Sequence, residues 1–516
     1  MFAKIYSAAF FGLDNLLVSV EVDVSNGLHA FNIVGLPDLA IKEAKQRISA
    51  AIKNIGAKSP LRANKKITIN LAPADFKKTG SHYDLAMAIG YLVASGQLKP
   101  FVTEKKLFIG ELTLNGELRP VNGVLPITLF AQENNFQELF LPRENLKEAA
   151  AALKNNHYLK LIGLNNLKEV TSYLNGNTRI APSLPHLKNL QEDNSFGDFS
   201  LIKGQEKAKR ALTIAAAGAH NVLMVGPPGS GKTLLAKAFH SLLPPLNQEE
   251  SLEVTKIYSI AGLLDHNNPI ITSPPFRQPH HSSSSVALLG GGVIPQPGEI
   301  TLAHRGVLFL DELPEFRRDV LEGLRQPLEE GKISIARANA RMQFPAKFIL
   351  ISAMNPCPCG YFRDPEKECL CRPIDVLRYR KKISGPFLDR IDIIINVFRL
   401  TSEEFLSQEE QKEIVFKIKN QIKESRERQK QRFQANKIFT NSEMSLKEIN
   451  QYCSLDQETE LSFKKAIDHY YLSPRACHRL LKVSRTIADL EGEEKIKKEH
   501  LSEALQYKTE NLLANF

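Results

Sequence analysis

The feature that most constrains this chain is a short apolar run that leads into a glycine-rich turn and then into a helical pattern. Residues 222–225 are apolar and uncharged, as a central parallel strand is, and residues 226–233 read G-P-P-G-S-G-K-T. Glycines let such a loop bend so that successive backbone N–H groups point at phosphate oxygens, while the following helix presents its positive end. The pattern G-x-x-x-x-G-K-T therefore predicts binding of a nucleoside triphosphate.

Each position of this loop has an expected role. Lys232 is expected to reach the β- and γ-phosphates, and Thr233 to hold a magnesium ion through its hydroxyl. A chance glycine-rich turn is the alternative, but the strand before the loop and the helical pattern after it argue against that reading. The predicted nucleotide-binding residues are Gly226, Pro227, Pro228, Gly229, Ser230, Gly231, Lys232 and Thr233.

A second apolar run, residues 306–310, ends in the acids Asp311 and Glu312. Asp311 is expected to bind the magnesium ion through water, and Glu312 to polarise the water that attacks the γ-phosphate. The alternative is a strand that simply ends in surface acids. Together with the phosphate-binding loop, the pair predicts hydrolysis of the nucleotide and not binding alone.

The length of 516 residues predicts two to four domains, and the excess of 67 basic over 57 acidic residues favours a polyanionic partner without proving one. No apolar stretch reaches the roughly 18 to 20 residues of a membrane helix. Residues 1–13 faintly resemble a signal peptide, but they continue into the alternating strand pattern of residues 17–24. We therefore expect a first hairpin, a cytoplasmic location and no membrane partner.

The chain divides into four parts by pattern. Residues 1–174 mix strand patterns (66–71 and 107–112) with helical patterns (39–55 and 84–95), which predicts an α+β domain. Residues 175–199 are rich in Asn, Pro, Ser and Gly and predict a linker. Residues 200–400 predict the α/β nucleotide-binding core, and residues 401–516 a helical lid.

Several further segments resemble the YifB/ComM family, a magnesium-chelatase-like branch of the AAA+ ATPases. The segments are 276–281, 290–292, 297–299, 302–304, 351–360 and 384–392. The resemblance runs nearly end to end. It implies an ATP-hydrolysing ring motor, a homo-hexamer, that acts on single-stranded and branched DNA and drives branch migration of recombination intermediates during DNA uptake.

The resemblance also implies roles for single residues. Asn355 resembles the sensor residue that helps to orient the attacking water, although an ordinary strand-end cap is the alternative. Arg390 resembles the arginine finger that a neighbouring subunit places beside the γ-phosphate, where a fixed positive charge stabilises the transferring group. The alternative for Arg390 is an intramolecular pair with Asp389 or Asp392.

In the lid, Arg475 resembles the arginine that senses nucleotide. Arg479 and Arg485 lie close by on the same predicted helix, so they compete for that role. If Arg390 acts on a neighbouring subunit, then the active enzyme must be a ring.

Four of the six cysteines form two tight pairs, Cys357 with Cys359 and Cys369 with Cys371. Paired thiolates at short spacing suit a tetrahedral zinc ion, because two loops can each offer two soft ligands. Free thiols and a redox role are the alternatives, and a reducing compartment weakens the disulfide reading. Cys453 and Cys477 are isolated in helical patterns and are expected to be small core residues.

The N-terminal part resembles the proteolytic domain of Lon-type proteases at residues 77–85 and 110–125. Lon-type chemistry uses a serine that a lysine activates. The serine position falls within residues 80–82, with Ser81 as the candidate, whereas the lysine position falls on Leu125. We therefore predict an inactive, Lon-protease-like domain without peptidase activity that serves as a structural or DNA-contacting collar.

Two basic segments are candidates for contact with DNA. Residues 331–344 alternate as a hairpin that turns near residues 338–339, and its Arg337 and Arg341 could contact phosphates, although a solvated turn is the alternative. In the lid, residues 412–437 hold nine basic and three acidic residues. Isoleucines recur there at 414, 418 and 422, which predicts one packed face and one basic face, either a DNA footprint or a solvated charge run.

Two other functions compete with the DNA motor. One is the motor subunit of a metal chelatase or another protein-remodelling ATPase. The other is an ATP-dependent peptidase, which Leu125 already weakens. A Lon-like domain and a cysteine loop are not expected in a chelatase motor, so the sequence favours the DNA motor.

Overall fold

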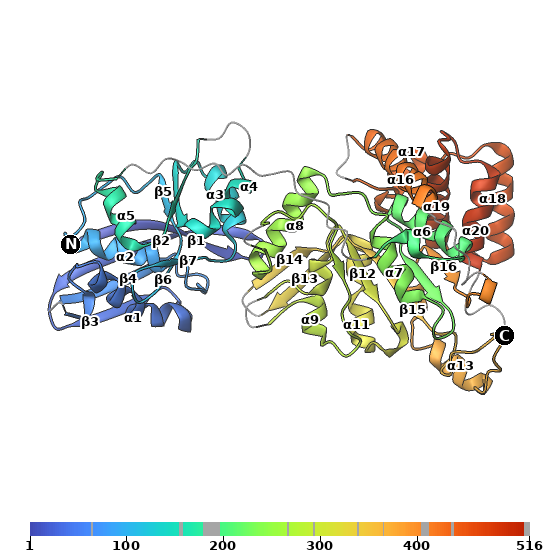
Figure 1. Ribbon diagram of the computed structural model, residues 1–516, viewed down its shortest axis with the longest axis horizontal. Coiled ribbons are helices and arrows are strands. Elements are labelled where there is room, and N and C mark those ends of the chain that lie inside the picture. The colour runs from blue at the N-terminus through green and yellow to red at the C-terminus, as the bar shows by residue number, and fades with distance from the viewer. Residues whose placement is uncertain are drawn as a thin grey trace. The chain divides into compact units, whose positions relative to one another are not determined.

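The computed structural model describes residues 1–62, 65–153, 158–178, 197–265, 268–292, 295–337, 340–364, 366–403, 412–434 and 438–509 (Figure 1). The chain forms two compact units, one from the described parts of Met1–Gln191 and Gln248–Ile271, the other from those of Glu192–Asn247 and Thr272–Phe516. Helix α8 (Gln248–Ala261) thus lies inside the sequence range predicted for the nucleotide-binding core but groups with the first unit. Most of the predicted linker lies outside the described residues.

A seven-stranded mixed sheet forms the centre of the first unit. Strands β1 and β2 form the predicted first hairpin, and β2 also pairs antiparallel with β4, whereas every other neighbouring pair in this sheet is parallel. In sheet order the strands are β3 (Ala30–Val34), β4 (Lys65–Ala72), β2 (Asp14–Asn26), β1 (Phe2–Phe11), β5 (Lys106–Phe108), β8 (Glu138–Pro142) and β9 (Lys160–Leu164).

The strand predicted at residues 107–112 is wrong as one element. The chain leaves the sheet after β5 because the N–H of Gly110 donates to the carbonyl of His82 and the carbonyl of Gly110 accepts from the N–H of Leu85, at the beginning of the preceding helix, α2 (Asp84–Ala94). Gly110 has a φ of 155°, which favours glycine, and only then do β6 (Glu111–Leu112) and β7 (Leu118–Arg119) pair as a separate ribbon.

Helices α1 and α2 lie where the sequence predicts them, and α2 is almost wholly buried. The buried carboxylate of Asp84, at the first residue of α2, is paired with Arg47 of α1 at 2.7 Å. The helices of this unit before α8 are α1 (Leu39–Asn54), α2 (Asp84–Ala94), α3 (Val124–Glu133), α4 (Leu146–Ala151) and α5 (Leu167–Leu174), with short 3-10 turns at Pro60–Arg62 and Arg143–Asn145.

Helix α8 is attached to this unit by buried polar contacts. The hydroxyl of Ser259 donates to Glu148 Oε1 at 2.6 Å, and the carbonyl of Ser259 accepts from the N–H of Gly123 at 3.1 Å. The same Glu148 oxygen accepts from the N–H of Leu125 at 2.9 Å. A buried carboxylate with satisfied bonds holds its partners in one arrangement, so α8 is fixed on α3 and α4.

The second unit is built on a five-stranded sheet in which all neighbouring strands are parallel. Its central strands are fully buried and, apart from Ser352 in β15, apolar, as expected for a parallel sheet that is covered on both faces. Because parallel strands end at one edge, the loops that follow them meet there. In sheet order the strands are β11 (Phe276–Arg277), β12 (Val307–Leu310), β15 (Ile349–Met354), β10 (Val222–Val225) and β16 (Ile393–Asn396).

The helices of this unit fall into a group around the sheet and a C-terminal helical group, which Figure 1 shows in orange and red. The predicted helical C-terminal region is thereby confirmed. Around the sheet lie α6 (Glu206–Gly218), α7 (Lys232–His240), α9 (Ser285–Leu289), α10 (Glu299–Leu302), α11 (Arg318–Gly323), α12 (Arg325–Glu330), α13 (Pro373–Arg380) and α14 (Gly385–Leu388). The C-terminal group contains α16 (Lys412–Arg432), α17 (Leu446–Tyr452), α18 (Gln457–Tyr470), α19 (Pro474–Glu491) and α20 (Lys498–Thr509). Short 3-10 turns occupy Phe199–Leu201, Leu313–Glu315 and Asn441–Glu443.

The packed face predicted for α16 is partly wrong. Ile414 is 53% exposed, whereas Ile422 is buried together with Val415, Ser425 and Gln429. Gln429 is drawn inward because its side-chain amide donates to the carbonyl of Ala217 at 2.9 Å. A polar side chain can occupy the buried face when its bonds are satisfied, which an apolar periodicity does not reveal.

Three arginines of the basic run on α16 bind groups of the second unit itself. Arg426 donates to the carbonyl of Ala216 at 2.7 Å, and Arg428 to the carbonyl of Asp489 at 2.6 Å. Arg432 pairs with the buried carboxylate of Asp489 at 2.5 Å. These three side chains bind protein groups, so the surface of α16 that faces solvent is less basic than its sequence indicates.

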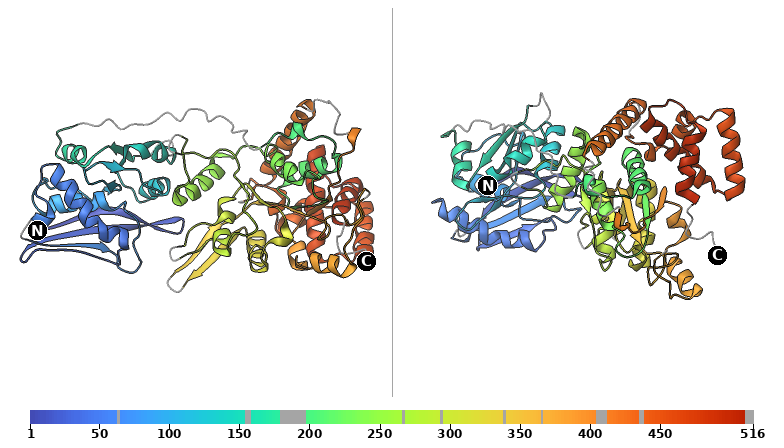
Figure 2. Two further views of the ribbon diagram at one scale, coloured as in Figure 1. Left: turned by 60° about the horizontal axis from the view of Figure 1, so that its bottom comes forward. Right: turned by 45° about the vertical axis from the view of Figure 1, so that its right-hand side comes forward.

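The predicted hairpin is present as strands β13 (Lys332–Arg337) and β14 (Ala340–Pro345). They pair antiparallel from Lys332 opposite Pro345 to Arg337 opposite Ala340, and in Figure 2 they project from the body of the second unit. The turn itself and the side chains of Arg337 and Arg341 lie outside the described residues. Within the described parts of the chain, no helix combines the length and the apolar character needed to cross a membrane.

Candidate nucleotide-binding and catalytic site

The glycine-rich loop lies between β10 and α7 at the edge where the parallel strands end. Gly229 and Gly231 have φ angles of 77° and 87°, a conformation that favours glycine. A Cβ at Gly226 would collide with the carbonyl oxygen of Val397, so the backbone there allows no side chain. The loop therefore has the backbone path that a phosphate-binding loop needs, and it opens a helix at Lys232.

Lys232 is held at the centre of this loop. Its Nζ donates to the carbonyls of Gly226 and Pro227, both at 2.8 Å, and lies 3.3 Å from Oδ1 of Asn355. Burial lowers the pKa of Lys232 to about 8, although the nearby Asp311 opposes this. The structure thus brings together the predicted phosphate-binding lysine and the predicted sensor, which are 123 residues apart in the chain.

The two predicted magnesium-binding residues are in direct contact. Thr233 Oγ1 donates to Asp311 Oδ2 at 2.7 Å, so a hydroxyl and a carboxylate lie next to each other. The other oxygen of Asp311 accepts the N–H of Glu312 at 2.9 Å. Hydroxyl and carboxylate oxygens are the ligands that Mg²⁺ prefers beside substrate phosphates, so these residues fit the ion.

Glu312 follows strand β12 in a left-handed conformation, with a φ of 52°. Its side chain is 59% exposed, and its Oε2 lies 3.3 Å from Nδ1 of His281. The His281 ring packs against His280, with centroids 4.1 Å apart. No role for His281 is expected from the sequence, because nothing in the pattern shows that its segment approaches Glu312.

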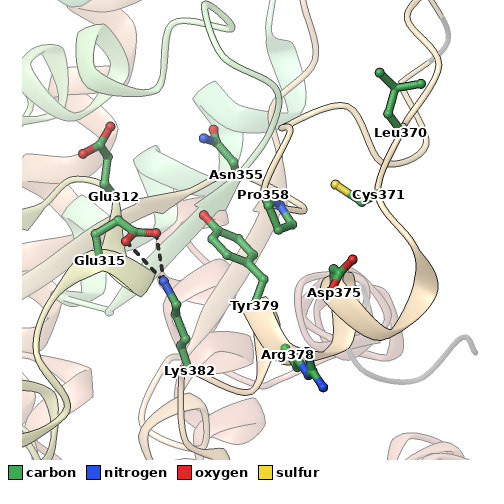
Figure 3. A pocket seen from close by; sticks show the side chains of 10 residues that line it. All are labelled: Glu312, Glu315, Asn355, Pro358, Leu370, Cys371, Asp375, Arg378, Tyr379 and Lys382. Atoms are coloured by element: carbon green, nitrogen blue, oxygen red, sulfur yellow. Dashed lines mark hydrogen bonds and ion pairs between the residues drawn. The ribbon is translucent and has the colours of Figure 1, made fainter.

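A cavity of about 770 Å³ adjoins Glu312 and Asn355 (Figure 3). Lys382 pairs with Glu315 at 3.2 Å on one side of it. The lining residues are Glu312, Glu315, Asn355, Pro358, Leu370, Cys371, Asp375, Arg378, Tyr379 and Lys382. The ends of strands β12 and β15 thus lie beside a cavity whose far wall comes from the cysteine-containing segment and helix α13.

The two predicted phosphate-sensing arginines share one acid. Nη2 of Arg390 and Nη2 of Arg475 each lie 2.7 Å from Oε1 of Glu329, at the end of helix α12. The Arg390 side chain is 4% exposed and that of Arg475 is 60% exposed. Burial would raise the pKa of Glu329, but both arginines hold it below its usual value. The acids expected as alternatives for Arg390, Asp389 and Asp392, are not its partner in this pair.

Asp392 has its own set of partners. Its carboxylate lies 2.6 Å from Nη1 of Arg479, accepts the N–H of Asn221 at 2.9 Å and lies 3.7 Å from Nδ1 of His220. Burial would raise its pKa, but the charge of Arg479 and the other partners hold it far below the ordinary value. Asp392 therefore links strands β10 and β16 to the lid helix α19. Arg485, the other competing arginine, is buried and pairs with Asp489.

Replacing Asp392 by Asn is expected to lower the unfolding free energy of the second unit by about 3–5 kcal/mol at pH 7, because the largely buried Arg479 loses its counter-charge. The folded-state pKa of Asp392 is depressed. Its contribution is therefore complete above the unfolded carboxyl pKa of about 3.9 and disappears as the pH falls through the folded-state value. Urea unfolding followed by circular dichroism, at pH 7 and at lower pH, measures the loss of unfolding free energy and its pH dependence. Asp319→Asn, in an exposed pair with Arg317, is the matched control, and equal effects of the two variants would contradict the expectation.

The four cysteines predicted as zinc ligands come together at the entrance of helix α13. Their sulfur atoms all lie within 4.8 Å of one another. Cys357 is buried and the other three are partly buried. Of the two remaining cysteines, Cys453 is buried as expected, whereas Cys477 is only partly buried.

Comparison with known proteins gives the family. The chain is 44% identical over 511 residues to Competence protein ComM of Haemophilus influenzae, which covers 98% of this chain and 97% of that protein. The chain belongs to the YifB/ComM family. It is also 40% identical over 507 residues to YifB of Salmonella typhimurium, with 98% of this chain and 97% of the relative covered.

Family models place this family beside the magnesium chelatases. The model "Magnesium chelatase, subunit ChlI" matches residues 198–405, "Subunit ChlI of Mg-chelatase" matches residues 20–145, and "Magnesium chelatase, subunit ChlI C-terminal" matches residues 413–508. The Magnesium-chelatase 67 kDa subunit of Heliobacterium mobile is 31% identical over 186 residues, 31% of this chain and 28% of that protein. This magnesium-chelatase-like AAA+ membership supports an ATPase motor and implies ATP and Mg²⁺.

The first unit of this YifB/ComM member is covered in part by a chelatase family model, while its likeness to Lon-type domains stays a prediction. Ser81 donates to the carboxylate of Glu111. Leu125 is buried at the beginning of α3 and has no group that could activate a serine. The absence of peptidase activity in this domain stays a prediction.

Proposed function

We propose that the chain is the ATP-hydrolysing subunit of a ring motor that moves on DNA and drives branch migration of recombination intermediates during DNA uptake. The observation that carries this proposal is the convergence of Lys232, Thr233, Asp311, Glu312 and Asn355 at one edge of a parallel sheet. These are the groups that nucleotide hydrolysis requires, and they come from three different strands.

In the proposed site each side chain has one task. Lys232 and the loop N–H groups bind the phosphates, and Thr233 and Asp311 hold Mg²⁺, which neutralises the charge that develops on the phosphate oxygens. Glu312, at the rim of the cavity, polarises the attacking water, and Asn355 orients that water. The contact of His281 with Glu312 Oε2 engages one oxygen of the carboxylate that would act as the base.

The ring part of the proposal rests on Arg390. In this subunit Arg390 is buried against Glu329 and is not among the residues of the cavity that Glu312 and Asn355 line. An arginine finger in the YifB/ComM family is supplied by the neighbouring subunit, so we propose a homo-hexamer in which Arg390 completes the next pocket.

The DNA part of the proposal rests on the positive charge of the chain and on its sequence similarity to a competence protein. The formal charge of +10 favours a polyanion, and the hairpin of β13 and β14 carries two arginines, Arg337 and Arg341, within two residues of its turn. The similarity to Competence protein ComM over nearly the whole chain supports a DNA-related function, and single-stranded and branched DNA are the substrates that we propose. The four-cysteine cluster completes the proposal as a site for a structural zinc ion.

A second candidate is a chelatase-like or protein-remodelling motor subunit. The 31% identity to the Magnesium-chelatase 67 kDa subunit favours it, but that similarity covers only 31% of this chain. The similarity to ComM includes the N-terminal unit and the cysteine segment, which is why the DNA motor is our first choice.

A junction assay separates the two candidates. Wild-type protein with ATP and Mg²⁺ is expected to separate the arms of a fluorescently labelled three- or four-stranded DNA junction, and DNA is expected to raise its ATPase rate. Lys232→Ala should still bind the junction but leave it intact, because the side chain that binds the β- and γ-phosphates is gone. Arg337→Ala combined with Arg341→Ala should weaken DNA binding. The slope of the logarithm of the binding constant against the logarithm of the salt concentration should become shallower by about one for each DNA phosphate that is no longer neutralised.

If ATP hydrolysis were indifferent to DNA and junctions stayed intact, the DNA-motor proposal would be wrong and the remodelling alternative would take its place. Retention of ATPase activity in Lys232→Ala would instead contradict the assignment of the nucleotide site itself.

A further inference from the structure

The four-cysteine cluster has the dimensions of a tetrahedral thiolate site. The sulfur of Cys357 lies 3.4 Å from that of Cys359 and 3.7 Å from that of Cys369, and the Cys359 and Cys369 sulfurs are 3.6 Å apart. Four thiolates at about 2.3 Å from one zinc ion are separated by about 3.8 Å, close to these values. The distances are far longer than the roughly 2.05 Å of a disulfide.

Backbone groups around the cluster are arranged to support negative sulfur. The N–H of Phe362 donates to the sulfur of Cys357 at 3.3 Å, and the N–H of Cys359 donates to the sulfur of Cys371 at 3.4 Å. Hydrogen bonds of this kind orient metal ligands and stabilise their charged form. Two separate loops each supply a pair of ligands, which is the layout of a structural site.

The cluster also borders the cavity that Glu312 and Asn355 line. Cys357 follows Asn355 by two residues, and Cys371 lines the same cavity as Asn355 and Glu312 (Figure 3). On its other side the loop lies against the phosphate-binding loop. A Cβ at Gly360, whose φ is 86°, would fall 2.5 Å from Cδ of Pro228. The cysteine loop therefore packs directly against Pro228 of the phosphate-binding loop, with no room at Gly360 for even a methyl group.

We propose that the four cysteines bind one zinc ion and that this ion holds Asn355 and the cavity wall in the position that hydrolysis needs. The ion ties the segment that leaves strand β15 to the segment that enters helix α13, so it fixes both ends of the cavity wall. Asn355 acts on the reacting water, and the cysteines are positioning residues that act through it. The metal site stands on its own geometry, while its effect on turnover rests on the proposed ATPase function.

Metal analysis of the purified full-length chain tests the site. Wild-type protein is expected to carry one zinc ion per chain. A cobalt-substituted sample should show the thiolate charge-transfer and visible bands of a tetrahedral site. Cys371→Ser combined with Cys369→Ser should lose the metal, whereas Cys477→Ser, outside the cluster, should keep it. Wild-type protein that takes up neither zinc nor cobalt would overturn the metal site.

Steady-state kinetics test the positioning role. Cys371→Ser is expected to lower kcat for ATP by about 10–100-fold, while the Kd for ATP, set by the phosphate-binding loop, changes by less than about threefold. Cys371→His supplies an imidazole as the fourth zinc ligand, so this variant should retain zinc and recover most of kcat. It keeps the test decisive even if the serine variant folds poorly.

Loss of zinc from Cys371→Ser with an unchanged kcat would overturn the positioning role, and so would a histidine variant that retains zinc without recovering kcat. Wild-type protein that carries zinc but hydrolyses no ATP would count against the proposed function and leave the metal site intact.

Discussion

Replacing Glu312 by Gln is expected to lower the ATP turnover number by about 10²–10⁴-fold, the range over which a positioned general base contributes to catalysis. Glutamine has nearly the same shape but cannot accept the proton of the attacking water. Binding of ATP should be unchanged within about threefold, because the contacts of the phosphate-binding loop are untouched. Single-turnover hydrolysis and equilibrium binding of a fluorescent ATP analogue measure the two quantities separately.

Glu315 supplies a matched control for this variant. It lines the same cavity, three residues further along, and its carboxylate is engaged by Lys382 at 3.2 Å. Glu315→Gln removes the same charge from the same cavity but no proposed base, so its turnover should stay within about twofold of wild type, as for a surface ion pair of small effect. If both variants lost turnover equally, local charge and not proton acceptance would explain the effect.

The contact between His281 and Glu312 adds a condition to this expectation. One carboxylate oxygen of Glu312, Oε2, lies 3.3 Å from Nδ1 of His281. The attacking water must therefore give its proton to the other oxygen, Oε1, unless the segment around His281 moves aside. Glu312→Gln removes proton acceptance at both oxygens, so its expected effect does not depend on the position of His281.

Local sequence patterns predicted much of the second unit because each signal there is short-range. An uncharged apolar run predicted strand β10, a glycine-rich turn predicted the loop after it, and a second apolar run predicted strand β12, which ends before the proposed magnesium ligand Asp311. The edge at which these pieces meet follows from the parallel topology alone. The contact between Lys232 and Asn355 follows from this topology, because strands β10 and β15 are neighbours in the sheet, whereas the role of Asn355 was predicted from the family resemblance.

What the sequence did not predict depends on contacts between distant segments. Glu329 looks like an ordinary acid at the end of a helix, and only the fold brings Arg390 and Arg475 to it. Helix α8 lies within the sequence range of the nucleotide-binding core, yet the hydroxyl of Ser259 on this helix donates to the buried Glu148 of the first unit. Such pairings leave no periodicity in the chain, so pattern reasoning has nothing to detect.

Replacing Arg390 by Ala is expected to lower ATP turnover by about 10³–10⁵-fold, the range for arginine fingers, with ATP binding intact. Within one subunit Arg390 is 4% exposed and paired with Glu329. To reach the γ-phosphate bound by a neighbouring subunit, the Arg390 side chain must break its pair with Glu329, unless Glu329 itself lies in the interface between the two subunits. Glu329 also holds Arg475, so both arginines would be released together when the neighbouring pocket is filled.

A mixing experiment distinguishes a finger that acts on the neighbour from one that acts on its own pocket. Arg390→Ala subunits keep an intact pocket, and Glu312→Gln subunits keep an intact finger. If the finger acts across the seam of a closed ring, then an equal mixture forms about a quarter of its seams with both parts functional and regains ATPase activity. If Arg390 acts within its own subunit, every pocket in the mixture lacks one part, and the mixture stays as inactive as either variant alone. Restoration also shows that Arg390→Ala folds and assembles, because an unfolded subunit could not contribute its pocket.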